Sequence, residues 1–432
     1  MSSSDTAQRL LTRLRALPLL PVTVVVLVLL SALVPVAALH DAATFEPVAE
    51  ATLRRPTSYV LMAPVSNVLD ALTLMSLRQH IALLVTIIAG YLVWWRLVGR
   101  KALEQVAPAR RVLREGARIG VGLVILLAVY AAMAVMPRPM AAIETSTEII
   151  AIDFHAHTRY SHDGRPDWTP ADVRQWHRDA GFGAAYITDH RTFEGAREAW
   201  ANNPPIGGEG TTLLPGIEVV WRGEHVNVLD ADRMYRGILT PTLSDVDDSA
   251  LVMASFLPNT EPILIETLPG NLSNVHAAKG AGTAGVRAIE IVDGAPLGLG
   301  QTRRERQRII AIADSFNLAL VAGSDNHGWG HTASAWTLMF VPLWRSASPE
   351  QISAGIPNVL RKGARESTRV VERYAANTDA EVALPFTVPL VAWGMFRSIS
   401  GDERIAWIVW TIALYALWRV SRARRKAPKP AQ

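Results

Sequence analysis

Two histidines separated by one residue, His155 and His157, follow an apolar segment that predicts a buried strand over residues 148–154. Side chains at positions i and i+2 of a strand point to the same face of the pleat. Two imidazoles on one face can bind one divalent metal ion, and Asp163, a few residues later, can reach a second. The spacing therefore predicts a metal site at the end of this strand.

Three later motifs carry the side chains that such a site would still need. Each follows an apolar run, and in chain order they read Ile187-Thr188-Asp189-His190, Pro215-Gly216-Ile217-Glu218 and Gly323-Ser324-Asp325-Asn326-His327. The chain has 432 residues and no cysteine, so nitrogen and oxygen must hold any metal ion. One such motif alone can be a surface acid or a turn. Their joint occurrence favours one shared metal site.

Taken together and in this order, the four motifs resemble those of the PHP (polymerase and histidinol phosphatase) family of metal-dependent phosphoesterases. The resemblance covers roughly residues 148–345, about half of the chain. It implies an α/β fold, a distorted (βα)7 barrel. By itself the sequence pattern predicts only a parallel α/β arrangement, with chemistry at the strand ends. The expected elements are a helix over 170–180, strands over 184–188 and 286–292, a helix over 303–316 and a strand over 318–322.

The resemblance also implies a set of metal ligands. They are His155, His157, Asp163, His190, Glu218, His225, His276, Asp325 and His327. Glu218 is expected to lie between two ions, and His162 is the alternative to Asp163. His276 is the candidate replacement for a histidine that relatives carry where this chain has Leu268, although nothing in the spacing requires it. The number of ions, two or three, is therefore left open, and their identity is expected to be manganese, zinc or iron.

The chemistry that these ligands support is hydrolysis by a metal-activated hydroxide. Three residues are candidates for the acid that protonates the leaving oxygen: His190, His225 and Asp325. Arg159 and Arg191 lie beside metal motifs and are candidates for binding the substrate phosphate. We therefore expect a metal-dependent phosphoric ester hydrolase acting on a phosphate mono- or diester. Two alternatives are an amidohydrolase-type enzyme and a non-hydrolytic metal-binding membrane sensor or scaffold, which Leu268 motivates.

The two ends of the chain are apolar and predict a membrane protein. Residues 1–147 are expected to contain three transmembrane helices, over 19–39, 79–95 and 118–136. A signal peptide is the competing interpretation of the first. The hydrolase domain is expected over 148–375 and a C-terminal membrane region over 376–432. In that region 404–419 is a predicted crossing, and 384–396 is an interfacial segment or a short crossing.

The positions of basic residues predict the orientation in the membrane. Seven lie between the second and third apolar segments: Arg96, Arg100, Lys101, Arg110, Arg111, Arg114 and Arg118. By the positive-inside rule this loop and the N-terminus are cytoplasmic, so residues 148–375 lie outside. This fits a multi-pass protein of a bacterial cytoplasmic membrane. The expected partners are the lipid bilayer and a phosphorylated small molecule or envelope phospho-compound. No nucleic acid is expected, because the basic residues cluster beside the apolar segments.

Overall fold

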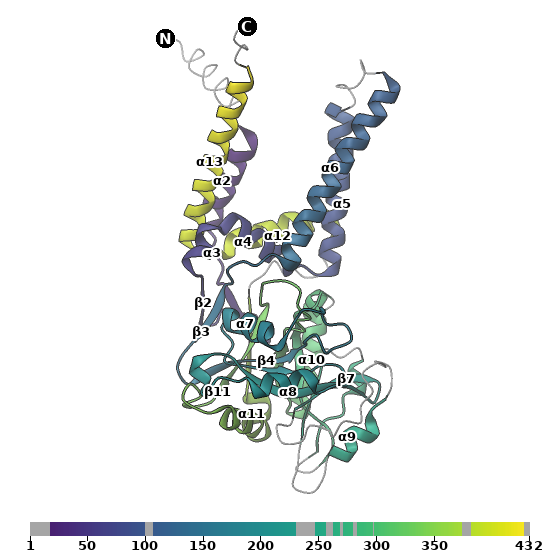
Figure 1. Ribbon diagram of the computed structural model, residues 1–432, viewed down its shortest axis with the longest axis vertical. Helices are drawn as coiled ribbons and strands as arrows, with labels where there is room; N and C mark the ends of the chain where they lie inside the picture. The colour runs from purple at the N-terminus through teal and green to yellow at the C-terminus, as the bar shows by residue number, and fades with distance from the viewer. Residues whose placement is uncertain are drawn as a thin grey trace.

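The computed structural model describes residues 18–99, 107–229, 247–255, 262–267, 271–279, 283–296, 298–373 and 382–426. It consists of a β-rich domain and two pairs of long helices that project from it in the same direction (Figure 1). One pair is α2 with α13, and the other is α5 with α6. We call the helix ends nearest the β-rich domain the helix feet. Shorter helices lie across the feet of both pairs, between the pairs and the domain. The metal-binding motifs all belong to the β-rich domain.

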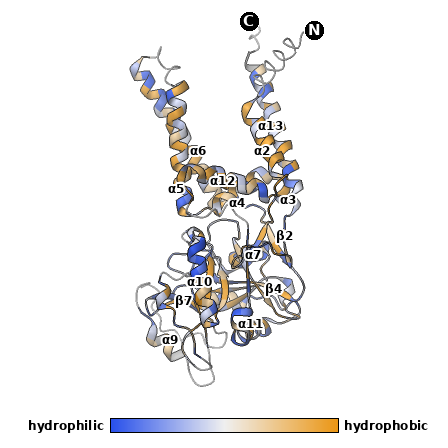
Figure 2. Cartoon of the chain, turned by 180° about the vertical axis from the view of Figure 1, so that it is seen from behind, coloured by the Kyte–Doolittle hydropathy of each residue, from blue (hydrophilic) through white to orange (hydrophobic). Residues whose placement is uncertain are grey.

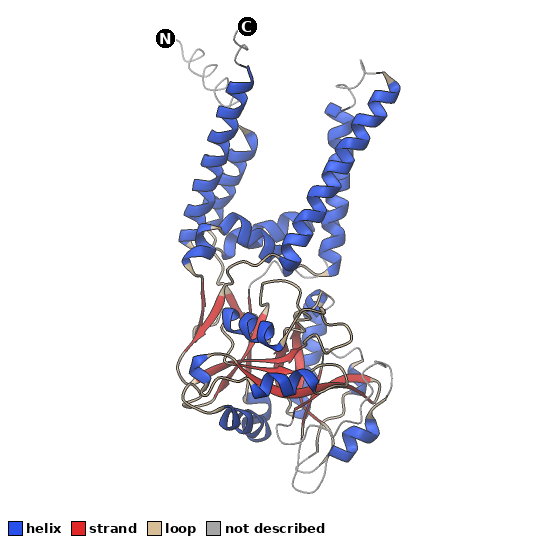
Figure 3. Ribbon diagram, in the orientation of Figure 1, coloured by secondary structure: helices blue, strands red, loops and turns tan. Residues whose placement is uncertain are grey.

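Ten strands form the main sheet of this domain, in the order β1-β12-β11-β4-β5-β6-β7-β8-β9-β10 (Figure 3). Strands β4, β5 and β6 are parallel, as are β8, β9 and β10, while the other neighbouring pairs are antiparallel. In chain order the strands are β1 (Leu39–Asp41), β4 (Ile149–Ala156), β5 (Ala184–Ile187), β6 (Thr212–Trp221), β7 (Glu224–Leu229), β8 (Ile263–Glu266), β9 (Val286–Asp293), β10 (Ala319–Gly323), β11 (Ala335–Phe340) and β12 (Arg369–Arg373). Strands β2 (Ala51–Arg54) and β3 (Ala142–Thr145) form a separate pair.

The sheet curls until the segment after β10 meets β4. The Asp325 backbone N–H donates to the His155 carbonyl at 2.9 Å, and the His157 N–H donates to the Asn326 carbonyl at 3.2 Å. The α/β expectation is therefore confirmed, but the sheet is mixed, because five of the nine neighbouring strand pairs in this described sheet are antiparallel. Strands β6 and β7 are joined by a tight hairpin, without a helix, because Arg222 and Gly223 both have positive φ (55° and 83°). Such a turn matches the twist of antiparallel strands.

The curled sheet has a core on each face. One core draws apolar side chains from β4 through β11 and from α11 (Pro349–Gly363), including Phe154, Tyr186 and Ile265. On the other face, α7 (Pro170–Ala180), α8 (Glu194–Ala201) and α10 (Arg303–Phe316) pack through residues such as Trp176 and Ile309. Helix α11 follows β11, which is antiparallel to β4, so α11 lies toward the start of β4. The opposite end of the sheet, where the parallel strands finish, faces the projecting helices (Figure 1).

Local sequence signals explain why the predicted helices of this domain are correct. Thr169 and Asp172 form a capping box that begins α7, and Gly181, with φ 87°, ends it. Thr302 and Glu305 begin α10 in the same way. The remaining short helices are α3 (Thr57–Leu61), α4 (Ala63–Thr73), α9 (Ser249–Ser255), η3 (Gly207–Glu209), η4 (Leu272–Asn274), η5 (Gly298–Gly300), η6 (Ala364–Glu366) and α12 (Leu384–Ser398).

The projecting helices are α2 (Leu19–Ser31), α5 (Leu77–Trp94) with η1 (Trp95–Gly99), α6 (Pro108–Val135) and α13 (Gly401–Lys426). Figure 2 shows that their surfaces are largely apolar. Within the described residues, Leu77–Gly99 and Pro108–Val135 are the two helices long and apolar enough to cross a membrane. The predicted crossing over 19–39 is too long, because helix α2 ends at Ser31 and Leu39 already pairs with β12. Pro35, in the segment between them, cannot continue a helix.

A buried polar network joins the helical part to the β-rich domain. Its centre is Asp70 of α4, which is 2% exposed. One carboxylate oxygen accepts from Arg138 at 3.0 Å and from Thr332 at 2.8 Å. The other accepts from Arg373 of β12 at 2.5 Å and from Tyr59 of α3 at 2.7 Å. Because these partners come from four separate segments, the network fixes the helix feet on the sheet.

Candidate metal centre

The two histidines predicted to begin the site lie at the end of β4, and both are buried. Their ring centroids are 5.0 Å apart. The neighbouring Asp153 carboxylate holds this strand end in place: it accepts from the Ser324 N–H at 2.9 Å and lies 2.7 Å from the His177 ring. The register between β4 and β5 shifts between Asp153 and Ala156, so the strand is irregular where the histidines project.

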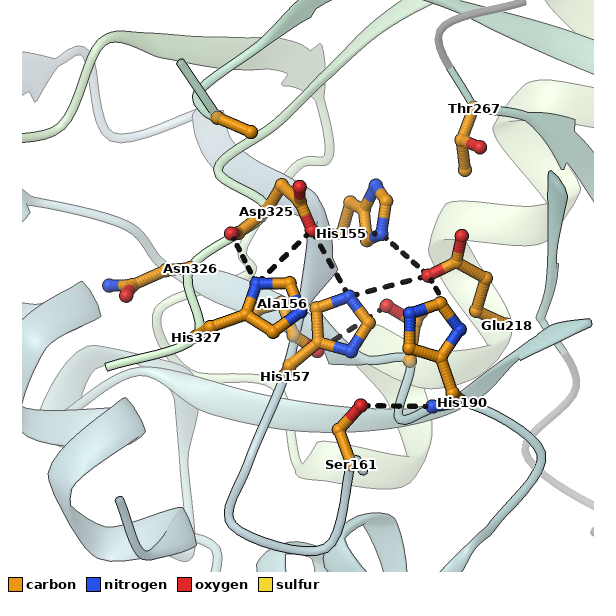
Figure 4. Close-up of polar contacts among 12 residues, drawn as sticks. His155, Ala156, His157, Ser161, His190, Glu218, Thr267, Asp325, Asn326 and His327 are labelled. Atoms are coloured by element: carbon orange, nitrogen blue, oxygen red, sulfur yellow. Dashed lines mark hydrogen bonds and ion pairs between the residues drawn. The ribbon is translucent and has the colours of Figure 1, made fainter. Parts of the chain in front are cut away.

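Glu218 of β6 contacts several histidines of the cluster, as Figure 4 shows. Its Oε2 atom lies 2.9 Å from His155 Nε2, 3.3 Å from His157 Nε2 and 3.6 Å from His190 Nδ1. Its Oε1 atom lies 2.6 Å from His225 Nδ1, on the adjacent strand β7. Both carboxylate oxygens therefore face histidines, and Glu218 belongs to one candidate ion site, with His190 and His225. The role of a ligand shared between two ions, which the family resemblance implies, stays a prediction.

The loop after β10 completes the cluster from the other side. Asp325 Oδ1 lies 3.2 Å from His157 Nε2 and 3.4 Å from His155 Nε2. The His327 ring stacks on that of His157 with centroids 4.1 Å apart. Asp163, from the loop after β4, approaches His327 Nε2 to 3.1 Å and His190 Nε2 to 3.4 Å. The chosen Asp163 thus faces two histidines, while the alternative His162 only approaches the His190 ring, at 4.9 Å.

Four groups of these side chains could each hold one ion, with ligand atoms within 4.8 Å of one another. Eight of the nine predicted ligands belong to them. The groups are His155 with His157 and Asp325; His157 with Asp163, His190 and His327; His190 with Glu218 and His225; and His155 with Glu290 and Asp293. The first three groups share His157 or His190, so they form one continuous site.

His276 does not join the cluster. Its side chain is exposed and lies against the ring of Trp221, with centroids 6.0 Å apart. No group within the described residues includes it. Leu268, which stands where relatives carry a histidine, lies outside the described residues. The spacing did not require His276 as a ligand, and the structure places it elsewhere.

Two acidic residues that the sequence did not single out lie beside the site. Glu290 Oε1 is 3.5 Å from His155 Nδ1, and Asp293 follows at the end of the same strand, β9. Both are buried. Burial and the charges of Asp325 and Glu290 raise the pKa of Asp293 well above its ordinary value. The available signal was a carboxylate pair that ends an apolar strand, the same pattern that marks the other motifs.

The candidate arginines are engaged in ion pairs. Arg191 donates to Asp248 at 2.8 Å, and both side chains are nearly buried. Its backbone N–H also donates to the Glu218 carbonyl, at 2.9 Å. Arg159 is 39% exposed and pairs with Glu198 at 3.3 Å. Their predicted role in binding phosphate requires these pairs to open, and it stays a prediction.

The electrostatics of the cluster show strong mutual attraction. Burial opposes a charged His155, but the carboxylates of Glu218, Asp325 and Glu290 outweigh it and raise the His155 pKa well above 6.5. The same balance raises the pKa of His157 to about 10. For Glu218, burial opposes the charge, and the histidines nevertheless lower the pKa well below 4.5. His155 and His157 thus lie where positive charge is favoured, and a metal ion bound there would displace the protons.

Several buried ring nitrogens in the cluster lack ordinary partners. Both ring nitrogens of His157, Nδ1 of His155 and Nε2 of His327 have no partner in hydrogen-bond geometry among the described residues. Such groups are costly to bury. His157 Nε2 and His327 Nε2 lie within 3.3 Å of carboxylate oxygens, and nitrogen with oxygen is the donor set of manganese, zinc and iron sites. The residues present therefore fit divalent metal ions.

Comparison with known proteins gives weak likenesses. No family model and no curated protein matches the chain. Among solved structures it is similar to PsfC of Pseudomonas syringae, with 15% identity, TM-score 0.35 and coverage of 57% of this chain and 97% of that one. It is also similar to a two-domain protein of Bacteroides vulgatus containing a predicted PHP-like metal-dependent phosphoesterase. There the identity is 15% and the TM-score is 0.33, and the match covers 52% of this chain and 66% of that one. For Endonuclease Q in complex with a 27-mer duplex substrate, the identity is 14% and the TM-score is 0.35, and the match covers 49% of this chain and 57% of that one. At these values no activity is transferred to this chain.

Proposed function

We propose that residues 148–375 form a PHP-type, metal-dependent phosphoesterase on a distorted (βα)7 barrel, which hydrolyses a phosphate mono- or diester. The observation that carries this proposal is the convergence of eight predicted ligands, Glu218 among them, in one continuous cluster that holds buried imidazole nitrogens without a hydrogen-bond partner among the described residues. These side chains come from five strand ends or following loops, far apart in the sequence. A cluster without a ligand would leave buried nitrogens unsatisfied at several places at once.

The residues divide naturally into roles. His155, His157 and Asp325 would hold one ion, and Asp163, His190 and His327 would hold a second. Two or three bound ions would supply a hydroxide at neutral pH and neutralise charge on the phosphate oxygens. His225 is the favoured proton donor for the leaving oxygen, because its side chain is 45% exposed while Glu218 orients its ring. The other two candidates, His190 and Asp325, lie deeper among the ligands.

We also propose that α2, α5, α6 and α13 cross a bacterial cytoplasmic membrane, with the metal centre outside the cytoplasm. Both helix pairs project from the β-rich domain in the same direction, which supports this topology (Figure 1). Their residues are largely apolar (Figure 2), and many of these side chains are exposed, which supports it as well. The basic residues at the start of α6 and at the end of α13 lie at the ends far from the β-rich domain. Helix α12, predicted as an interfacial segment or short crossing, lies across the feet of the pairs and suits the interface.

The experiment combines metal analysis of the purified full chain with hydrolysis of p-nitrophenyl phosphate and bis-p-nitrophenyl phosphate, with and without added manganese. We expect two or three ions for each chain and turnover of at least one ester, both reduced in His157→Ala. Bound metal without turnover of any ester would favour a sensor or scaffold. A chain that binds no metal would contradict the proposal. A reporter inserted between β12 and α12 tests the topology, and activity on the cytoplasmic side would contradict it.

A further inference from the structure

A cavity of about 350 Å³ lies directly beside the metal centre. One wall carries three of the candidate ligands, Asp163, Asp325 and His327. The opposite wall does not belong to the β-rich domain. It consists of residues from the helix ends nearest that domain: Thr73 and Leu74 at the end of α4, His80 of α5, and Met133 and Ala134 of α6. The cavity therefore connects the reacting centre with the base of the proposed membrane helices.

Backbone hydrogen bonds make the helix feet a built part of this wall. The Gly330 N–H donates to the Ala134 carbonyl at 2.8 Å, which ties α6 to the loop that carries His327. At the other helix of the pair, the Leu77 N–H donates to the Pro296 carbonyl at 3.3 Å, beside the end of β9. The Trp176 indole donates to the Gly330 carbonyl at 3.1 Å. The helices thus contact the same loops that position the metal ligands.

The wall away from the ligands offers apolar contact. Leu74, Met133 and Ala134 line it, and Ala295, Pro296 and Trp329 add apolar contact from the loops of the β-rich domain. Polar groups on the helix side are already satisfied: the His80 ring pairs with the Tyr130 hydroxyl at 2.9 Å, and the Thr73 hydroxyl donates to the Leu69 carbonyl at 2.9 Å. The Thr332 hydroxyl is likewise bound to Asp70. A purely polar substrate would therefore find few free partners on this side.

The apolar surface continues from the cavity along the helices. Leu77 and Ile81 of α5 and Val135 of α6 are each about half exposed, at 51%, 49% and 47%. Trp329, at the cavity, is 54% exposed. An indole at this position has an apolar body and one polar N–H, which is typical of residues at a membrane interface. The exposed apolar side chains of Leu77, Ile81 and Val135 lie on α5 and α6, which both contribute to the cavity, so a molecule bound with its phosphate at the ligands can extend an apolar chain along them toward the bilayer.

We propose that the substrate is a phosphate ester of a long apolar chain, a lipid phosphate drawn from the membrane. The phosphate lies at the wall of Asp163, Asp325 and His327, and the chain lies against Met133 and Trp329. Water attacks phosphorus, the bond to the chain oxygen breaks, and the products are inorganic phosphate and the chain alcohol. This inference rests on the proposed phosphoesterase function and narrows its substrate class.

The test uses the full chain in lipid nanodiscs with added manganese and a series of n-alkyl phosphates from ethyl to decyl. Release of inorganic phosphate is measured below the micelle-forming concentration of each ester. We expect kcat/KM to rise along the series, by at most roughly 3- to 4-fold for each methylene that becomes buried. The wall variants Met133→Gln and Trp329→Ala should flatten this rise. The first changes the helix side of the cavity and the second changes the loop side.

Leu127→Gln provides the matched control, because it places the same side chain on α6 at a site that is 68% exposed and outside the cavity lining. The ester partitions into the lipid equally for all variants. If partitioning alone caused the rise of kcat/KM with chain length, the rise would persist in Met133→Gln and Trp329→Ala. That result would overturn the proposal of a lipid substrate. Equal kcat/KM for ethyl and decyl phosphate would also overturn it while leaving the phosphoesterase intact. If the metal-loaded chain hydrolyses no ester of the series, both the lipid substrate and the proposed phosphoesterase function are contradicted.

Discussion

The molecule contains two buried clusters of charge, and they differ in how completely the protein neutralises them. At Asp70, both carboxylate oxygens have two protein partners, and two of the four are arginines. In the metal cluster, carboxylates meet histidines instead, and four buried ring nitrogens there have no hydrogen-bond partner among the described residues. Guanidinium is always charged and only donates, whereas imidazole can offer a lone pair to a cation.

This difference separates a structural role from a chemical one. The Asp70 network is complete without any ligand, and it holds α4, Arg138 and β12 together at the feet of the helices. Asn67 extends it, donating to the Tyr59 hydroxyl at 3.3 Å and to Glu403, in the first turn of α13, at 2.7 Å. Under the proposed function, the histidine cluster is instead completed by bound cations. Substitutions in the Asp70 network should accordingly change the stability of the fold, and substitutions in the histidine cluster should change metal content and hydrolysis.

The largest effect is expected for Glu218→Ala. Its carboxylate lies between histidines of two candidate ion sites, so its loss should reduce bound metal and lower hydrolysis by roughly 10³-fold or more. Metal analysis and steady-state kinetics of the purified variant measure both. Glu350→Ala, an exposed acid in the first turn of α11, is the control and should retain both properties. Wild-type turnover in Glu218→Ala would remove this residue from the site.

Asp70→Ala should instead unfold the protein more easily. The substitution leaves two arginines buried without their carboxylate, which typically costs about 3–5 kcal/mol of unfolding free energy. Asp314→Ala is the matched control, because Asp314 also pairs with an arginine, Arg365 at 2.7 Å, but its side chain is 57% exposed. That change should cost about 1 kcal/mol or less. If both variants unfold alike under denaturant, the network does not hold the helices on the domain.

Metal addition should stabilise the parent chain without affecting the Asp70 network. Ions that bind only the folded chain add roughly 2.7 kcal/mol at one hundred times their dissociation constant. The Tm of both the parent and Asp70→Asn should rise on adding manganese, and that of His157→Ala should rise much less. A rise of equal size in His157→Ala would mean that manganese acts at some other place.

The pH dependence of the Asp70 network has a defined sign. Burial raises the pKa of Asp70, but Arg373 and Arg138 outweigh it, so the folded pKa lies below the ordinary value. The stabilisation is therefore fully present above the unfolded pKa of about 3.9 and is lost as pH falls through the folded value. The Tm difference between parent and Asp70→Asn should stay constant from about pH 8 to pH 5 and shrink below about pH 4. If the Tm difference vanishes between pH 7 and pH 5, the titration of a group other than Asp70 causes it.

The smallest effect is expected for His276→Ala. The side chain is exposed beside Trp221 and outside the cluster, so metal content and hydrolysis should match the parent. His225→Ala is the informative counterpart, because the ring of His225 lies 2.6 Å from Glu218. Loss of one ion in His276→Ala would show that this residue replaces the absent histidine at Leu268.

Much of the candidate site could be predicted from sequence because its ligands occur in short motifs at strand ends. His155 with His157, and Asp325 with His327, are each two residues apart, so local backbone geometry brings the members of each pair together. Helices α7 and α10 were equally predictable, since capping boxes mark where they begin. These features depend on interactions between near neighbours in the chain.

Other features depended on residues far apart in the sequence, and only the tertiary structure decided them. Arg191 is paired with Asp248, 57 residues later, and Glu290 reaches His155 only because the sheet curls. The sequence determined which side chains could bind metal and which segments are apolar. Folding determined that the feet of α4, α5 and α6 form a wall of the cavity beside those ligands. The conformational preferences of neighbouring residues cannot specify such contacts. These contacts arise from packing between elements that are far apart in the chain and share no sequence pattern.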